Sequence, residues 1–106
     1  VIQWHWLATV PPEQRQGQEL RQYDLTPQQY DSLVRLTAAL CTVLPRIHCD
    51  YPRDGSGRLI THTLTPEQFA SYRGILGHYH IQDNKTDPGP ALDWDRVIGD
   101  ARRLMR

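Results

Sequence analysis

The chain has 106 residues, which suits one domain of ordinary size or a piece of one. Its 12 basic and 12 acidic residues balance to zero net charge, which excludes the strongly basic surface of nucleic-acid-binding proteins and the polybasic segments attracted to anionic membranes. No apolar stretch approaches the ~18 residues of a membrane-spanning helix, and no signal peptide is recognisable.

The beginning of the chain predicts a strand followed by a loop. Residues 1–10, VIQWHWLATV, are rich in β-forming side chains in partial alternation, as in a strand. Residues 11–24 are polar and contain two consecutive prolines and a glycine, which favour a loop or an insertion.

The next segment carries the clearest helix signal in the sequence. Thr26 suits the N-cap position, Pro27 suits the first helical position, and Gln29 is placed to complete a capping box. Apolar residues then recur at spacings of three and four over residues 30–44, which predicts one buried helix face. Pro45 is expected to end the helix because proline cannot continue it.

The middle of the chain predicts a turn-rich loop and a second, shorter helix. The loop covers residues 50–59, where glycine, aspartate and proline are frequent. The sequence LTPEQF at residues 64–69 repeats the helix-start signal of LTPQQY at residues 25–30. We expect this second helix to be short because Gly74 interrupts it.

The last third of the chain predicts a strand, a loop and a final helix. ILGHYHI at residues 75–81 has the composition of a strand, and a proline-rich loop extends to Pro90. From Trp94 to Met105 the apolar residues mark one helix face. Two strands and three helices in this order predict an α/β fold, with a sheet covered by helices.

The two cysteines leave two interpretations open. Cys41 and Cys49 lie eight residues apart, which is compatible with a disulfide in a secreted protein and with two free thiols. Neither belongs to a CxxC pair, so a zinc knuckle or a thioredoxin-type motif is not indicated.

Residues 77–94, GHYHIQDNKTDPGPALDW, concentrate the candidate chemistry. Lys85 is the only lysine in a chain whose other basic residues are all arginine. It lies two residues before Asp87, and Pro88 favours an extended backbone there, so the two side chains are expected on one side of the chain. Histidine nitrogen and carboxylate oxygen are zinc ligands, so His78 and Asp87 are candidate metal ligands with the Lys85 ammonium near the open position.

Spacing alone also allows an ordinary structural interpretation of the same three residues. His78 could be a buried histidine that is hydrogen-bonded to backbone, and Asp87 a carboxylate that caps a turn. Lys85 could be a solvated loop charge.

The combination of GH, KTDPGP and the following hydrophobic residue with DW resembles the zinc-dependent N-acetylmuramoyl-L-alanine amidases of the AmpD type. These are relatives of phage lysozyme-type amidases and of animal peptidoglycan recognition proteins. The helix beginning LTPQQYDSLVRLTAAL also resembles the long helix that precedes the motif in those enzymes, so the resemblance covers roughly residues 25–98. It implies a central mixed β-sheet flanked by helices, with residues 1–106 forming the C-terminal part of a single zinc amidase domain.

The resemblance also implies an activity and a role for each candidate residue. His78 and Asp87 correspond to zinc ligands, and Lys85 to the residue that stabilises the oxyanion of the tetrahedral intermediate. The expected reaction is hydrolysis of the amide between N-acetylmuramic acid and L-alanine in peptidoglycan or muropeptides. A non-catalytic muropeptide-binding module of the same fold is the alternative, and an unrelated α/β domain is the third interpretation. A periplasmic or secreted location is favoured over a cytoplasmic one.

The sequence departs from the family pattern in four places, one of which is the stretch from Cys41 to Thr65, longer than the usual link into the motif. His80 stands where other members often have aspartate, and the loop between His78 and Lys85 is short. The family's first zinc histidine and its general-base glutamate precede the long helix, where this chain offers His5, its only histidine there, and Glu19 as a nearby glutamate. We therefore expect an N-terminal fragment of the same protein as a partner that supplies a further zinc histidine and a catalytic glutamate.

Overall fold

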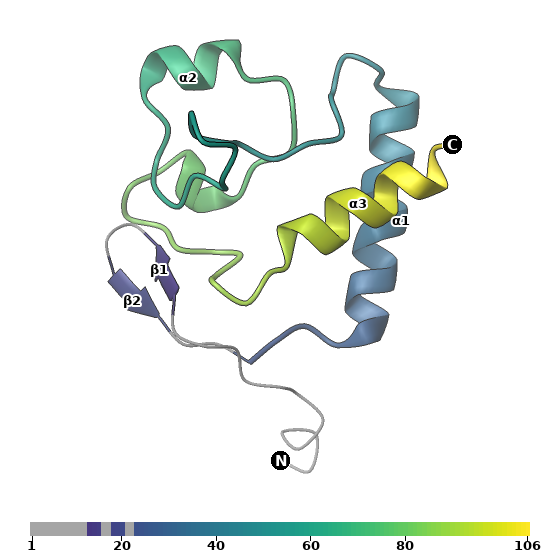
Figure 1. Ribbon diagram of the computed structural model, residues 1–106, viewed down its shortest axis with the longest axis horizontal. Coiled ribbons are helices and arrows are strands. Elements are labelled where there is room, and N and C mark those ends of the chain that lie inside the picture. The colour runs from purple at the N-terminus through teal and green to yellow at the C-terminus, as the bar shows by residue number, and fades with distance from the viewer. Residues whose placement is uncertain (1–12, 16–17, 21–22) are drawn as a thin grey trace.

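The computed structural model describes residues 13–15, 18–20 and 23–106. In this part of the chain, helices dominate and the strands are short (Figure 1). In chain order the elements are β1 (Glu13–Arg15), β2 (Gln18–Leu20), α1 (Pro27–Val43), α2 (Pro66–Ser71), a 3₁₀ helix η2 (His78–His80) and α3 (Trp94–Leu104).

The helix predicted after residue 25 is confirmed with its capping chemistry. The Thr26 side chain accepts a hydrogen bond from the Gln29 backbone N–H at 3.1 Å, and the Gln29 side chain accepts one from the Thr26 N–H at 2.8 Å. Helix α2 begins with the same box, built by Thr65 and Gln68. Because Pro27 and Pro66 have no backbone N–H, each helix start has three N–H groups without a partner inside the helix, and the capping box satisfies two of them.

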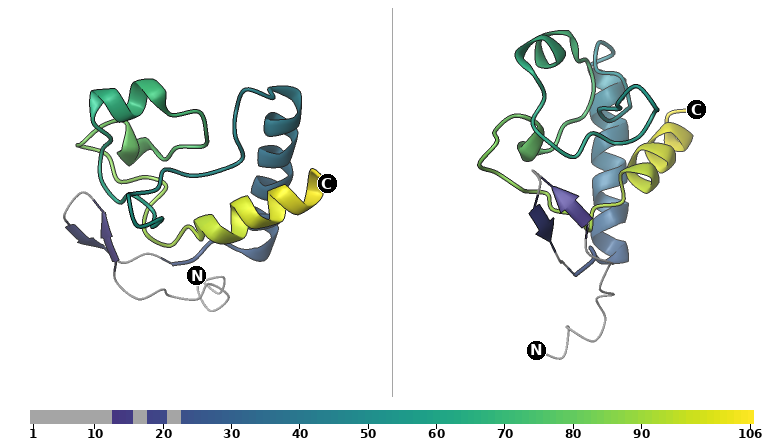
Figure 2. Two further views of the ribbon diagram at one scale, coloured as in Figure 1. Left: turned by 45° about the horizontal axis from the view of Figure 1, so that its top comes forward. Right: turned by 60° about the vertical axis from the view of Figure 1, so that its left-hand side comes forward.

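Helix α3 lies across α1, and the two helices form one side of the molecule (Figures 1 and 2). Small side chains fill the contact, because Val34, Ala38 and Ala101 form one buried cluster. The start of α3 belongs to a larger apolar cluster that also includes side chains of α1 and of the segment before α3, namely Tyr30, Tyr51, Tyr79, Leu92, Trp94, Val97 and Ile98. This second cluster joins the helix pair to the rest of the chain.

The predicted central mixed β-sheet is wrong for the residues that the structure describes. Their only sheet is the antiparallel pair β1–β2, with Glu13 opposite Leu20, in a segment for which a loop was predicted. The predicted strand at residues 1–10 lies outside the described residues. Where the sequence predicted helices flanking a sheet, α1 and α3 bury their apolar faces against each other and against turns.

The strand predicted at residues 75–81 is also wrong, because residues 78–80 form the 3₁₀ helix η2. A strand with one buried face would alternate buried and exposed side chains. Here Tyr79 and His80 are consecutive and both are fully buried, whereas Ile81 is 50% exposed. Two adjacent buried side chains do not fit a strand with one buried face, and the turn of η2 accommodates them instead. The apolar composition of residues 75–81 is compatible with either arrangement.

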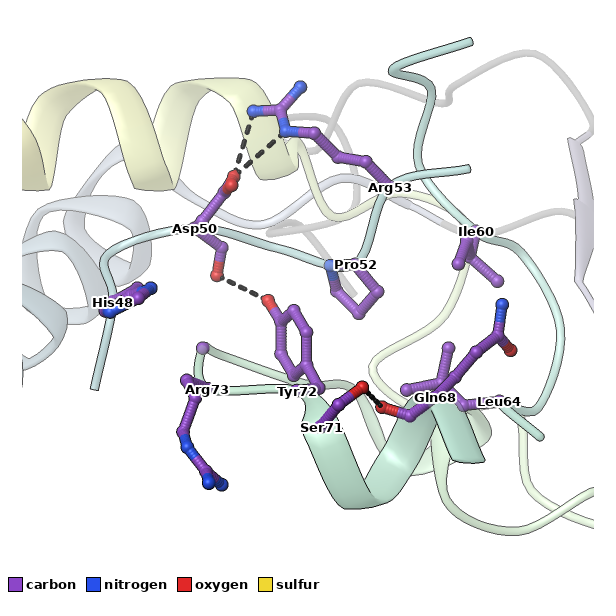
Figure 3. A pocket seen from close by; sticks show the side chains of 11 residues that line it. His48, Asp50, Pro52, Arg53, Ile60, Leu64, Gln68, Ser71, Tyr72 and Arg73 are labelled. Atoms are coloured by element: carbon purple, nitrogen blue, oxygen red, sulfur yellow. Dashed lines mark hydrogen bonds and ion pairs between the residues drawn. The ribbon is translucent and has the colours of Figure 1, made fainter. Parts of the chain in front are cut away.

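Helix α2 ends at Ser71, three residues before the glycine expected to stop it. Tyr72 is extended, and its hydroxyl lies 3.0 Å from the backbone oxygen of Asp50 and 3.1 Å from that of Ile75. Figure 3 shows this hydroxyl in contact with the Asp50 backbone oxygen and the Asp50 carboxylate paired with Arg53; these residues line a cavity of about 340 Å³. The tyrosine therefore ties the end of α2 to the loop that follows α1.

Both cysteines are free thiols in the structure. Cys41 is buried on α1, and Cys49 is half-buried against the α1–α3 contact. Burial, with Cys41 beside it, raises the pKa of the Cys49 thiol to about 11, so the protonated thiol prevails at neutral pH.

In the described part of the chain, no helix combines the length and the apolar character that crossing a membrane would require.

Candidate functional site

The structure brings His78 and Asp87 into direct contact at the surface. His78 Nδ1 lies 3.1 Å from Asp87 Oδ2, although the two residues are nine positions apart. Both side chains are accessible, with 41% of the His78 side chain and 69% of the Asp87 side chain exposed. An accessible pair of this kind differs from the buried structural histidine that was the alternative interpretation of His78.

The close approach of the two segments depends on the glycine before His78. A Cβ atom at Gly77 would lie 2.8 Å from Pro88 Cδ and 3.0 Å from Tyr79 Cε1, closer than packed carbon atoms approach. The Tyr79 backbone N–H donates to the Asp87 backbone oxygen at 3.2 Å across this contact. One packing contact therefore joins the glycine of the GH motif, Gly77, to Asp87 and Pro88 of the KTDPGP motif.

The turn after Asp87 has its own glycine requirement. Gly89 has φ +86°, a left-handed conformation that side-chain-bearing residues rarely adopt. Its N–H donates to the Thr86 backbone oxygen at 2.8 Å, which closes the turn. The PGP sequence therefore reverses the chain directly after the candidate ligand.

His80 supports the site from beneath and does not contribute to it directly. It is fully buried, its Nδ1 accepts a hydrogen bond from the Gly77 N–H at 2.9 Å, and its Nε2 lies 2.6 Å from the Ile60 oxygen. Because a backbone N–H can only donate, Nδ1 must carry no proton, and Nε2–H donates to Ile60. His80 is a structural residue that fixes the backbone of the 77–80 turn.

Tyr30 on α1 holds the other end of the KTDPGP segment. Its hydroxyl lies 2.7 Å from Asp24 Oδ1 and 3.2 Å from the Ala91 oxygen, and it accepts a hydrogen bond from the Asp93 N–H at 2.9 Å. Burial, assisted by the hydrogen bond to Asp24, raises the pKa of Tyr30 to about 12. One side chain therefore joins the start of α1, the candidate loop and the N-cap of α3.

The geometry of the pair fits two ligands of one zinc ion. Ligand atoms about 2.0–2.1 Å from a tetrahedral metal lie roughly 3.3 Å from each other. The 3.1 Å between His78 Nδ1 and Asp87 Oδ2 is close to this value. The donor types, one imidazole nitrogen and one carboxylate oxygen, are also those that zinc prefers.

Gln82 completes this arrangement and was not predicted from the sequence. Its Oε1 lies 2.6 Å from His78 Nε2, so the ring lies between two oxygen atoms, one from Gln82 and one from Asp87. Metal-binding histidines commonly donate their second N–H to such an oxygen, which orients the ring and leaves the other nitrogen for the metal. The spacing of four residues after His78 was the only signal for this contact in the sequence.

Lys85 lies in the exposed turn between these residues. Its backbone N–H donates to the backbone oxygen of Gln82 at 3.3 Å. Its side chain is exposed, as is that of Asp87 two residues later. The proposed role of its ammonium group stays a prediction.

A complete three-residue metal centre is not present among the residues that the structure describes. No group of three His, Cys, Asp or Glu side chains converges there. His5 lies outside the described residues, and for Glu19 only the backbone in β2 is described. The expectation that a further segment supplies the missing ligand stays a prediction.

Comparisons of this chain with protein-family models, with curated proteins and with solved structures found no match. The resemblance of residues 25–98 to the zinc amidases therefore depends on the GH…KTDPGP motif and on the helix signal that precedes it.

Proposed function

We propose that this chain forms part of a zinc-dependent amidase that hydrolyses the bond between N-acetylmuramic acid and L-alanine in peptidoglycan or muropeptides. The observation that carries the proposal is the 3.1 Å contact between His78 Nδ1 and Asp87 Oδ2 within the GH…KTDPGP arrangement. Two donor atoms of the types that zinc prefers lie on an accessible surface, separated as two ligands of one metal would be. They belong to the residues that the resemblance assigns as ligands.

Each residue of the site has a separate task in this proposal. His78 Nδ1 and the Asp87 carboxylate would hold the zinc, and Gln82 keeps the His78 ring in the required orientation. When bound, zinc supplies Lewis-acid polarisation of the amide carbonyl and lowers the pKa of a water ligand.

Lys85 would stabilise the negative charge that develops on the carbonyl oxygen of the substrate. A charged donor aimed at that oxygen is among the strongest contributions to acyl-transfer catalysis. A lysine suits this task because its ammonium group is compact, whereas a wide guanidinium group fits poorly beside a metal. This accounts for the single lysine in a chain that otherwise uses arginine.

The high exposure of the pair suits a polymeric substrate. With 69% of the Asp87 side chain accessible, a glycan strand with attached peptides can reach the site without entering a deep pocket. A hydrolytic zinc site uses three protein ligands and one water. The third ligand and the general base are assigned to a segment outside residues 23–106, in agreement with the expected N-terminal partner.

A non-catalytic muropeptide-binding module is the second candidate. The observation that favours it is that the described residues supply two zinc donors and not three. One assay distinguishes the two candidates, because a binding module would bind muropeptides without releasing any peptide from them.

Zinc content and hydrolysis test the proposal together. His78→Ala and Asp87→Ala should each lose bound zinc and the release of L-alanyl peptides, measured by elemental analysis after dialysis and by chromatography of muropeptides. His62→Ala and Asp31→Ala are matched controls, because each removes an exposed side chain of the same type elsewhere. Zinc retained at the parent level in both site variants would contradict the assignment.

A further inference from the structure

A groove of about 710 Å³ begins beside the candidate zinc site. One wall comes from the start of α2, and the other from the turn that follows η2. Gln82 lines the groove, and its Oε1 is the atom that lies 2.6 Å from His78 Nε2. A ligand in this groove would therefore lie next to a substrate bond held at His78 and Asp87.

The groove has an apolar half with two large side chains that the fold leaves half exposed. Phe69 on α2 is 49% exposed, and Ile81 after η2 is 50% exposed. Leu64 and Pro66 also line the groove. An exposed aromatic ring beside aliphatic groups offers a flat apolar surface, and the C–H face of a sugar ring packs well on such a surface.

The other half of the groove is polar and lacks positive charge. Gln82, Asp83 and Asn84 line it and provide carboxamide and carboxylate groups that can hydrogen-bond to hydroxyl and acetamido groups. No lysine or arginine belongs to this groove in the described part of the chain. A peptide stem carries carboxylates that Asp83 would repel, whereas an N-acetylhexosamine is neutral, so the charge favours the glycan.

We propose that this groove binds an N-acetylhexosamine ring of the glycan strand, with Phe69 as the stacking surface and Asn84 as a hydrogen-bonding residue. The inference rests on the proposed function, since it assigns the groove to the second sugar, the neighbour of the N-acetylmuramic acid whose amide is cut. Pockets of ~300–1,000 Å³ hold drug-sized ligands, so the groove has room for one or two sugar rings.

The first test measures binding alone, with a chelator present, so that hydrolysis plays no part. The probe is N,N′-diacetylchitobiose, a peptide-free disaccharide, titrated into the protein while backbone amide shifts are recorded. We expect shifts at residues 81–84 and a dissociation constant that rises at least about fivefold in Phe69→Ala and in Asn84→Ala. Leu36→Ala, which removes a 56% exposed side chain from α1, should leave binding unchanged.

The second test compares two substrates in the zinc-loaded protein that includes its expected N-terminal partner. Phe69→Ala should raise KM for a disaccharide tripeptide and leave KM for N-acetylmuramoyl-L-alanine, which lacks the second sugar, within about twofold. Chitobiose that binds Phe69→Ala and the parent equally, or shifts that appear only with a stem peptide, would overturn the inference. Disaccharide binding without hydrolysis of either substrate would overturn the proposed function and leave the groove assignment in place.

Discussion

The α1–α3 pair and the segment between these helices are stabilised in different ways. The helices meet through regularly spaced apolar side chains such as Val34 and Ala101. Residues 44–93 contain only α2 and η2 as helical elements, and side chains that bond to distant backbone hold much of this segment, as His80 does with Ile60. The candidate site lies entirely in this second region.

The difference indicates how each region should respond to substitution. A helix face distributes its stabilisation over many apolar contacts, so one changed side chain removes a fraction of it. In the 44–93 segment, single contacts fix the backbone, as at Gly77 against Pro88. Single substitutions there should therefore displace the site.

The largest expected effect is on catalysis at Lys85. This residue is exposed in the loop region, so Lys85→Ala should leave the fold and the bound zinc unchanged. If its ammonium stabilises the developing charge, kcat should fall by roughly 10²–10³-fold, as for the loss of one oxyanion donor. The measurements are muropeptide hydrolysis and zinc content in parallel.

Two further variants make this prediction specific. Lys85→Arg keeps the charge and should still lose most of the activity, because a wide guanidinium fits poorly where a compact ammonium is required. Arg58→Ala removes an exposed basic side chain from another loop and should keep the parent rate. Parent-level hydrolysis in Lys85→Ala would show that the lysine has no role in the reaction.

The next effect concerns the contact on which the site is built. Gly77→Ala introduces a Cβ atom 2.8 Å from Pro88 Cδ, which should displace the Asp87 turn from His78. We expect a loss of about 3 kcal/mol in the free energy of unfolding, typical of overpacking, together with weaker zinc binding. Urea unfolding and a zinc titration measure the two consequences.

Gly99 on α3 provides the matched control for this substitution. A Cβ atom there would meet nothing within 4 Å, so Gly99→Ala should stabilise the protein by about 0.5–1 kcal/mol through helix propensity. The same chemical change therefore has opposite signs in the two regions. Equal effects at both positions would contradict the described packing at Gly77.

The same division explains what the sequence could predict. The capping box at Thr26, the start of α3 at Trp94 and the periodic apolar positions are local signals, and the structure confirms them. Even there, burial was predicted wrongly at the ends of the two apolar helix faces, because Leu44 is 48% exposed and Leu104 is 58% exposed. Periodicity indicates which face is apolar and does not show how far a neighbour covers it.

The sequence indicated two residues of the candidate site and did not indicate the turn that brings them together. The motif identified His78 and Asp87, and the structure brings them into contact. The contacts of Gln82 and His80 depend on the turn at residues 78–82, whereas residues 75–81 were predicted as a strand because of their apolar and aromatic side chains. Side chain–backbone bonds between distant segments leave no periodic pattern in a sequence.

Tyr30 links the two regions, and its effect should be the smallest and should depend on pH. Tyr30→Phe removes the hydroxyl that joins α1 to the backbone at Ala91 and Asp93. At neutral pH we expect a loss of about 1–2 kcal/mol in the free energy of unfolding, since buried backbone groups lose a partner. Urea unfolding at several pH values measures the difference between the parent and the variant.

The difference between parent and variant should shrink in alkaline solution. The pKa of Tyr30 is raised from 10.0 to about 12 in the folded protein, chiefly by burial, so its contribution is fully present below pH 10. As the pH rises from 10 to 12, the unfolded chain ionises first and the contribution falls by roughly 2 kcal/mol, which is enough to cancel the difference of about 1–2 kcal/mol expected at neutral pH. Tyr30→Phe lacks this titration, whereas the other tyrosines titrate in both proteins and cancel. A difference that stays constant from pH 8 to 12 would show that this hydroxyl is not held in the buried contact described here.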